Sequence, residues 1–363
     1  MNGARFTRRA CIHAAAAMLA RPSWAGVVGA LRVAALASAW DDAEGRHHVG
    51  VLEVVQGGPS QPLRLRVCHQ LQVPTRAHAV VPAADGALVA VARRPGAWLL
   101  RWRPGSPASA ARWRWSEADR SFNGHVVPHG SRALMSTESD ATDGAGLLVR
   151  RDARTLAMLE EWPTGGIDPH AVLALPGGGW LVANGGVPTL PESGRVKGDL
   201  SAMDSSVVHL NAQGRQRGSW RLADKRLSLR HLARHAGGLV GLALQAEHDD
   251  PDERRRAPLI ALWDGQRLRP GEAAVLDGYA GDILARPSGF LVGATRASCV
   301  ARFDLQGQLV ARHPLAQACA LAPLGVDGWL AGGSAEGLMV AEMGAARVAG
   351  SQRLRLDNHW HRS

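Results

Sequence analysis

Three features of this 363-residue sequence predict an all-β fold built from repeated four-stranded units. A histidine recurs at intervals of about 40 to 60 residues, short hydrophobic strands follow it in a constant order, and helical periodicity is absent. Units of this length are typical of the β-propeller, whose blades are four-stranded sheets arranged radially. We therefore predict a seven-bladed β-propeller with one strand of each blade lining a central channel.

The recurrent position opens the first strand of each unit. In chain order it is occupied by His78, His125, His170, His231, Asp282 and Cys319. Because all blades of a propeller face one axis, equivalent residues should form a ring around the channel.

Second and third strands repeat as clearly. Turn dipeptides such as Asp85-Gly86 precede hydrophobic runs that predict the second strands, and alternating runs predict the third strands. The second strands are expected at 88–92, 134–138, 180–184, 290–294 and 329–333. The third strands are expected at 98–102, 146–150, 207–210, 259–263 and 300–303. Two insertions, 187–206 and 246–258, should overhang one face.

The two ends of the repeat complement each other. Residues 31–72 supply three strands without a first strand, at 33–37, 48–52 and 63–67. The tail 354–360 has the pattern of a first strand alone. Together they complete a seventh blade and close the ring, which places His359 in the recurrent position and makes residues 31–363 one propeller domain.

Composition excludes several classes of protein. Hydrophobic residues make up 46% and charged residues 20%, which excludes intrinsic disorder. The net charge of +10 comes almost wholly from scattered arginines, since Lys197 and Lys225 are the only lysines, so a nucleic-acid partner is not expected. No apolar run reaches the roughly 20 residues of a transmembrane helix. We expect a monomer.

The N-terminus resembles an export signal. Arg8-Arg9, the mildly apolar segment 14–20 and Ser23-Trp24-Ala25 occur in the order of a twin-arginine signal peptide covering residues 1–25. A coincidental arginine pair is the alternative in an arginine-rich chain. We predict export to the periplasm, with Cys68, Cys299 and Cys319 retained. A Cys299–Cys319 disulfide is one arrangement, and buried free thiols are the favoured one.

The ring carries residues that suit a ligand or a metal. Histidine is the commonest transition-metal ligand, Glu138 and Asn184 end equivalent second strands, and Gln245 ends the matching strand of a longer unit. The predicted channel site comprises His78, His125, Glu138, His170, Asn184, His231, Gln245, Asp282, Cys319, Asp357, Asn358 and His359. The candidate ligands for iron, copper or zinc are His125, His170, His231, His359 and Glu138.

A plainer alternative remains open. First strands of different blades do not pair, so ring neighbours should stand farther apart than the roughly 4.8 Å between paired strands, and the polar residues would then only line a wet channel. In the first insertion, Arg195 and Lys197 are a weaker candidate for capturing an anion, and plain solvation is the alternative.

Several motifs together resemble a bacterial family of unknown function, domain of unknown function family 1513. The motifs are Phe122–His125, Ser136–Asp140, Gly166–His170, Val182–Val187, Pro191–Met203, Leu227–Ala233, Ala318–Ala320 and Asp357–His359. The resemblance implies an exported propeller encoded near imelysin-type and iron-uptake proteins. Ala171 and Leu190 stand where the family usually has glutamate and histidine, so no role is transferred to them.

These observations favour a non-enzymatic periplasmic protein that binds a metal, a metal complex or an iron-uptake or imelysin-like partner at its channel. The alternatives are a metal-dependent hydrolase or lyase of the lactonase-like propeller type and a scaffold that holds protein partners on its rims.

Overall fold

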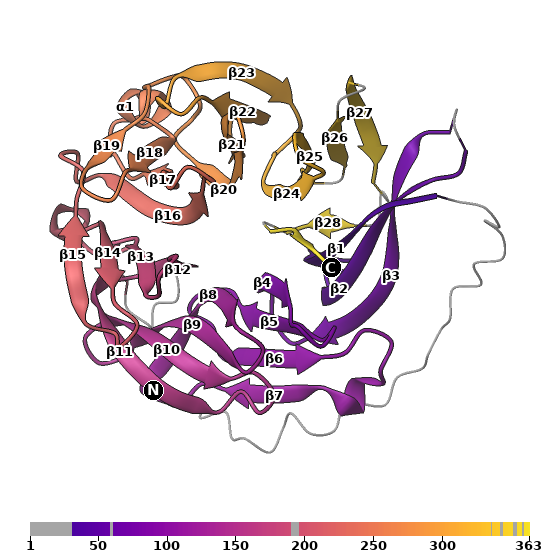
Figure 1. Cartoon of the computed structure of the whole chain (residues 1–363), viewed down its shortest axis with the longest axis horizontal. Coiled ribbons are helices and arrows are strands. Elements are labelled where there is room, and N and C mark those ends of the chain that lie inside the picture. The colour runs from indigo at the N-terminus through magenta and orange to yellow at the C-terminus, as the bar shows by residue number, and fades with distance from the viewer. Residues whose placement is uncertain are drawn as a thin grey trace, which may run out of the picture.

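The computed structural model describes residues 31–58, 61–189, 196–334, 336–341, 344–350, 354–357 and 359–363. The predicted export signal, residues 1–25, lies outside these residues. The strands form sheets that stand side by side around a centre, and the first strand of each sheet lies innermost (Figure 1).

Five sheets contain four consecutive antiparallel strands each. The first is β4 (Ala77–Pro82), β5 (Leu88–Ala92), β6 (Trp98–Trp102) and β7 (Arg112–Trp115). The second is β8 (Arg120–His129), β9 (Ala133–Asp140), β10 (Ala145–Asp152) and β11 (Met158–Ile167). The third is β12 (Pro169–Ala174), β13 (Trp180–Asn184), β14 (Ser206–Leu210) and β15 (Gln216–Trp220). The fourth is β16 (Leu227–Arg234), β17 (Val240–Ala246), β18 (Ile260–Trp263) and β19 (Leu268–Pro270). The fifth is β20 (Ala280–Arg286), β21 (Gly289–Ala294), β22 (Cys299–Phe303) and β23 (Leu309–Pro314).

The remaining strands belong to one nine-stranded sheet. Its C-terminal half is β24 (Ala320–Leu324), β25 (Gly328–Gly332), β26 (Gly337–Ala341) and β27 (Gly344–Ala349). Its N-terminal half is β1 (Leu31–Asp41), β2 (His47–Gln56) and β3 (Leu63–Val73). A short parallel contact between β27 and β3 joins the halves, and β28 (Arg355–Leu356) and β29 (His361–Arg362) both pair antiparallel with β1. The tail thus pairs as two short strands rather than as the single strand predicted.

The predicted strands agree with the structure most closely at their hydrophobic centres. The second strands expected at 88–92 and 180–184 coincide with β5 and β13. Side chains on both faces of these inner strands are buried, because each sheet packs against a neighbouring sheet on either side. Trp98 on β6 and Trp180 on β13 are each at most 2% exposed, and such close packing fixes the inner strands relative to one another.

A β-bulge recurs in the first strand of each four-stranded sheet, at the position of the repeated histidine. The pairing register with the second strand shifts at Ala77/Val80, Phe122/Val126, Pro169/Ala171, Leu229/Leu232 and Ala280/Ile283. The shifts bracket four of the histidines and Asp282. Bulges redirect side chains, so these residues turn out of the sheet toward the centre. Strand β24, which follows Cys319, pairs without such a shift.

The helical elements are short and lie in connections. Within the part of the chain that the structure describes, they are the 3₁₀ turns Ala108–Ala110 and Leu200–Ala202 and the helix α1 (Pro251–Arg256). The second and third of these belong to the two predicted insertions. Among the described residues, no helix has the length and apolar character needed to cross a membrane.

Candidate metal centre

Five imidazoles meet at the centre of the molecule. The His125 ring lies 4.8, 4.7, 5.2 and 5.2 Å, between centroids, from the rings of His78, His170, His231 and His359. These four rings follow one another around it, with centroid separations of 4.7 Å for three neighbouring pairs and 5.6 Å for His78 and His170. The side chains thus reach across the channel, so the spacing of the first strands does not keep the histidines apart.

The possible ligand atoms fall into two groups with the spacing of metal ligands: one contains His78, His125, His170 and His231, and the other contains His231, His359 and the Asp282 carboxylate. Nε2 of His359 lies 3.4 Å from Nε2 of His78. A tetrahedral ion with bonds of about 2.1 Å separates its nitrogen ligands by about 3.4 Å. One nitrogen from each of His78, His125, His170 and His231 also lies within 4.8 Å of the others. Nδ1 of His78 and Nε2 of His125 are buried without a hydrogen-bond partner, so neither atom is committed to another group among the described residues.

Burial keeps these imidazoles neutral. The pKa values of His78, His125, His170 and His231 lie well below the usual 6.5, first because burial disfavours the charged form and second because neighbouring histidines and arginines repel a proton. The neutral imidazole is the form that binds a metal. These four histidines are therefore in their ligating state at neutral pH.

Asp282 orients one of the rings. Its Oδ1 lies 3.3 Å from Nδ1 of His359, and its Oδ2 accepts the backbone N–H of Leu321 at 3.0 Å. A carboxylate on one nitrogen of a histidine places the proton there and leaves the other nitrogen free to bind a metal. Asp282, which occupies the recurrent position, thus contacts the candidate ligand His359 and orients its ring.

Gly124 makes room for the cluster. Its φ of +92° is left-handed, and a Cβ there would lie 2.8 Å from Cδ2 of His78. Glycine alone satisfies both constraints, so His125 follows a residue that lets its strand approach His78.

Glu138 is not with the histidines. Its carboxylate accepts hydrogen bonds from Nε and Nη2 of Arg151 at 2.9 and 2.7 Å, and both residues are buried. The sequence prediction of Glu138 as a metal ligand therefore has no support from its position. It belongs to an ion pair within its own sheet.

Replacing Glu138 with glutamine is expected to lower the free energy of unfolding by about 3 kcal/mol, because Arg151 loses its buried counter-charge. Zinc affinity, measured by calorimetry, should stay within about twofold, since the residue lies outside the cluster. Glu160→Gln, which alters an exposed pair with Arg150 in the same sheet, is the control and should cost at most about 1 kcal/mol. A tenfold loss of zinc affinity in Glu138→Gln would return Glu138 to the ligand set.

Other predicted channel residues are held by polar partners or lie apart. Asn184 donates to the Thr164 carbonyl at 3.1 Å, and Gln245 donates to Glu247 at 2.8 Å. Asp357 forms an ion pair with Arg76. Cys319 is buried, which raises its pKa to about 12, so it stays a protonated thiol and a poor ligand. Asn358 and Arg195 lie outside the described residues.

Two further predictions concern charge and redox state. Lys197 forms an ion pair with the buried Glu247, so it does not offer a free charge to an anion. The described cysteines Cys68, Cys299 and Cys319 are free thiols, and Cys68 is exposed. A Cys299–Cys319 bridge is thus not formed.

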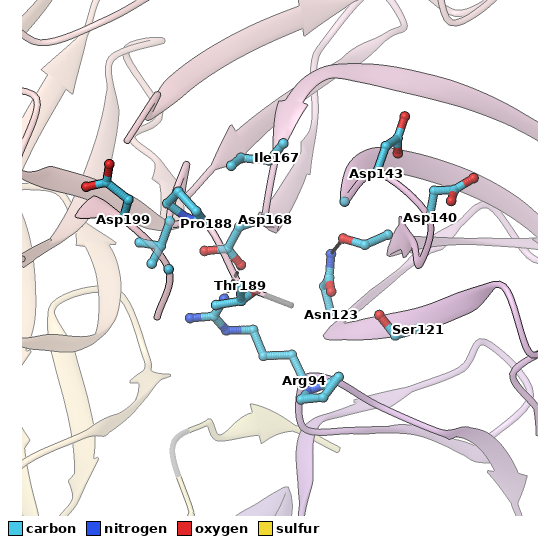
Figure 2. Close-up of a pocket in the computed structure, with 15 residues that line it drawn as sticks. Arg94, Ser121, Asn123, Asp140, Asp143, Ile167, Asp168, Pro188, Thr189 and Asp199 are labelled. Carbon is cyan, nitrogen blue, oxygen red and sulfur yellow. Dashed lines mark hydrogen bonds and ion pairs between the residues drawn. The ribbon is translucent and has the colours of Figure 1, made fainter. Parts of the chain in front are cut away.

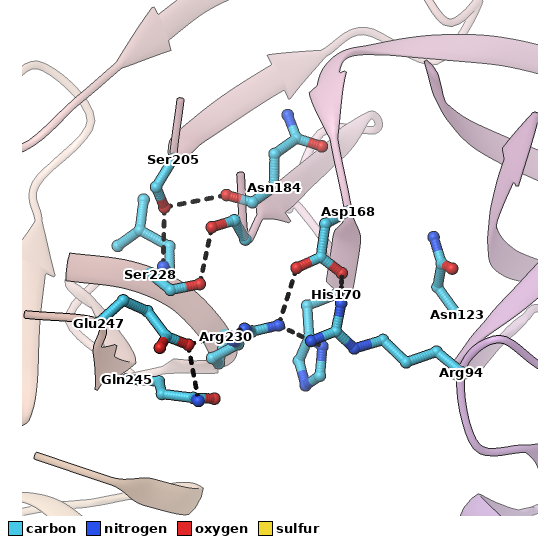
Figure 3. A network of polar contacts seen from close by, with 12 residues as sticks. Arg94, Asn123, Asp168, His170, Asn184, Ser205, Ser228, Arg230, Gln245 and Glu247 are labelled. Atoms are coloured by element: carbon cyan, nitrogen blue, oxygen red, sulfur yellow. Dashed lines mark hydrogen bonds and ion pairs between the residues drawn. The ribbon is translucent and has the colours of Figure 1, made fainter. Parts of the chain in front are cut away.

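Three charged residues beside the cluster were not predicted as part of the site. Asp168 accepts a hydrogen bond from Nη1 of Arg230 at 2.9 Å and forms a second ion pair with Arg94 (Figure 3). Nη1 of Arg230 also lies 3.4 Å from Nδ1 of His170. The available sequence signal was proximity, because Asp168 and Arg230 lie within two residues of recurrent histidines.

Two cavities reach the cluster from different sides. A cavity of about 20 Å³ is lined by Arg93, Arg94, Arg230, Gln245 and Tyr279 with three of the histidines, and we call it the arginine neck. A cavity of about 490 Å³, the apolar mouth, is lined by residues that follow the histidines along the first strands, such as Val81, Val126 and Leu232. His125, His231 and His359 also line the apolar mouth.

A third pocket, of about 350 Å³, adjoins the arginine neck through Arg94. Figure 2 shows Arg94 and Asp168 at this pocket together with Asn123, Pro188 and Asp199. Residues 187–189 and 198–199 of the first insertion thus line a pocket that shares Arg94 with the neck.

A model of a known protein family matches most of the chain. The family model described as a protein of unknown function (DUF1513) matches residues 71–363. The chain belongs to this family. The matched span contains all five clustered histidines, and the predicted resemblance is confirmed. None of the curated proteins compared matches the chain.

Solved structures with a similar fold share little sequence. A functionally unknown protein from Desulfotomaculum acetoxidans superposes with a TM-score of 0.54 at 10% identity, over 90% of this chain and 98% of that chain. The Dos1 propeller gives a TM-score of 0.47 at 13% identity, over 86% and 76%. Sqt1 of Saccharomyces cerevisiae gives 0.48 at 11% identity, over 86% and 83%. Likeness at this level concerns the fold alone, and the fold of this family member is all-β and propeller-like.

Proposed function

We propose that this protein is a transition-metal-binding propeller whose ion is held by the five-histidine cluster. The observation that carries the proposal is the convergence of His78, His125, His170, His231 and His359, from segments far apart in the chain, with neighbouring rings about 4.7 Å apart. Centroids of imidazoles at right angles around one ion with bonds of about 2.1 Å would be separated by a similar distance.

The chemistry of the cluster restricts the ion. An all-imidazole set suits zinc, copper, iron(II) or nickel, whereas calcium and magnesium require oxygen ligands. Four of the five ligands are held neutral by burial, and the Asp282 carboxylate contacts a histidine. The bound ion therefore keeps its positive charge.

We infer that the nine-stranded sheet counts as two blades, β24 to β27 and β1 to β3 with the tail, which gives seven. The pairing of β28 and β29 with β1 supports closure of the ring by the tail. On this architecture each of the five histidines comes from a different blade. Export to the periplasm and a role beside iron-uptake proteins stay predictions from the signal sequence and the family resemblance.

Metal analysis tests the proposal directly. Protein produced without an affinity tag, from cells grown with added zinc, copper and iron, should contain about one transition-metal ion per chain by mass spectrometry. Anomalous diffraction should place that ion among the five rings. Metal-free preparations that also fail to bind added zinc, copper(II) or iron(II) would refute the proposal.

The apolar mouth favours one second candidate, a metal-dependent hydrolase. Its 490 Å³ volume suits a small apolar substrate, and three of the proposed ligands line it. An ion there would polarise a carbonyl, and a neighbouring histidine would move a proton. Turnover of a panel of lactones and esters that disappears with a chelator would favour this candidate over a binding role.

A further inference from the structure

The arginine neck contains an unused pair of hydrogen-bond donors. Arg230 is 2% exposed, and its Nη1 is engaged by Asp168, yet its Nε and Nη2 have no hydrogen-bond partner. The nearest carboxylate oxygen, on Glu247, is 3.9 Å from Nη2, beyond hydrogen-bond distance. Buried donors without acceptors are rare in folded proteins, so we expect a ligand to accept hydrogen bonds from Nε and Nη2 of Arg230.

The free edge has a defined geometry. Nε and Nη2 of arginine point in parallel and bind the two oxygens of one carboxylate. Elsewhere in this protein, Arg221 uses the same two atoms to bind Asp204 at 2.6 and 2.9 Å. Arg230 lines the neck with its own Nε and Nη2 unpaired, and the nearby Glu247 is already engaged by Lys197 and Gln245.

The neck also carries unbalanced positive charge. Asp168 is shared between Arg94 and Arg230, so one carboxylate faces two guanidinium groups. Arg93 also lines the neck and forms no ion pair with any described residue. Burial lowers the pKa of both Arg93 and Arg230, which means that the protein destabilises the charged form of each side chain relative to water. Positive charge therefore exceeds negative charge by two, next to four histidines that burial holds neutral.

We propose that the arginine neck binds a small planar oxyanion of the carboxylate type, held by the fork of Arg230 and by Arg93, directly beside the metal. This inference rests on the proposed function and adds a second ligand to it. The cavity is small, about 20 Å³, which favours bicarbonate or formate over any larger acid.

Charge balance couples the two ligands. A divalent ion among neutral imidazoles adds two positive charges beside a neck that already carries two in excess. An anion between them lowers the repulsion, so metal and anion each bind more tightly when the other is present.

The test uses cobalt(II) as the probe, because its absorption bands report its coordination. Metal-free full-length protein is titrated with cobalt(II) at constant ionic strength in chloride, bicarbonate, formate or phosphate. We expect bicarbonate or formate at millimolar concentration to tighten cobalt binding about tenfold and to shift the bands, whereas chloride and phosphate should not. The bicarbonate and formate arms separate an inorganic ligand from an organic acid.

Variants locate the effect. Arg230→Lys keeps the charge and removes the fork, and Arg93→Gln removes a partly exposed charge, so each should reduce the enhancement to about twofold or less. Arg112→Gln on the outer strand β7 is the control and should behave as the unaltered protein. Arg93→Gln keeps the test valid if the buried Arg230→Lys variant does not fold.

The outcomes distinguish the two proposals. Absence of cobalt binding in every buffer counts against the metal site itself. Cobalt binding with equal affinity in all four anions overturns the oxyanion site alone. An equal enhancement by phosphate overturns the planar class, and an enhancement that survives both variants overturns the assignment to the neck.

Discussion

Replacing His125 and His231 together with alanine is expected to lower zinc affinity by at least about a thousandfold, since even outer-shell partners of a metal are worth about 10- to 100-fold each. These two rings are neighbours in the cluster, with centroids 5.2 Å apart, and both belong to the group whose nitrogens lie within 4.8 Å of one another. Isothermal titration calorimetry on metal-free protein measures the change.

A matched control removes two histidines outside the cluster. His129 packs on Trp180, and His235 packs on Phe290. The His129→Ala, His235→Ala variant should keep zinc affinity within about threefold, because distant sites act independently. If the His125, His231 variant binds zinc within tenfold of the unaltered protein, the cluster is not the metal site.

Acid is expected to destabilise the metal-free protein steeply below pH 6.5. The folded state holds His78, His125, His170 and His231 with pKa values well below 6.5, whereas the unfolded chain titrates near 6.5. As the pH falls through that value, the unfolded chain binds protons that the folded protein does not, so the stability present above pH 6.5 is lost. Each histidine contributes about 1.4 kcal/mol per pH unit, so four approach about 5 kcal/mol per unit.

Urea unfolding from pH 7.5 to 5.0, with a chelator present, checks this slope. A domain with an unfolding free energy of about 5 to 15 kcal/mol should lose most of it within two to three pH units. The His125, His231 variant retains two of the four histidines, and its slope should be about half as steep. A free energy that is flat over this range would show that the imidazoles are protonated or solvated in the folded state.

Most of the fold could be predicted from the repeat in the sequence. Turn dipeptides and hydrophobic runs placed strands such as β5 and β13, because both depend on local conformational preference and on alternation along one strand. The tail was harder, because it pairs with β1 as two short strands, β28 and β29, and the Asp357 side chain between them binds Arg76. Such a contact joins distant segments and leaves no local pattern.

The site was predictable in part for the same reason. Recurrence placed five histidines in one position, but their close approach depends on bulges, and a bulge is defined by its pairing partner. Glu138 was predicted as a metal ligand from its position at the end of a second strand. That position gave no sign of Arg151, which lies on β10 and forms an ion pair with the Glu138 carboxylate. Asp168 and Arg230 were missed because they do not repeat.

The span of chain between the clustered histidines has a consequence for how the protein comes apart. Repeat folds usually fray from one end, since each unit contacts only its neighbours. His78 and His359 meet although 281 residues separate them, with the other three histidines between. An ion bound by all five histidines would be released when any one blade unfolds. Unfolding a blade at either end of the chain would therefore cost the same metal-binding free energy as unfolding a blade in the middle. Occupancy of the centre would thus convert a modular chain into a single cooperative unit, and its lifetime would be set by the escape of the metal.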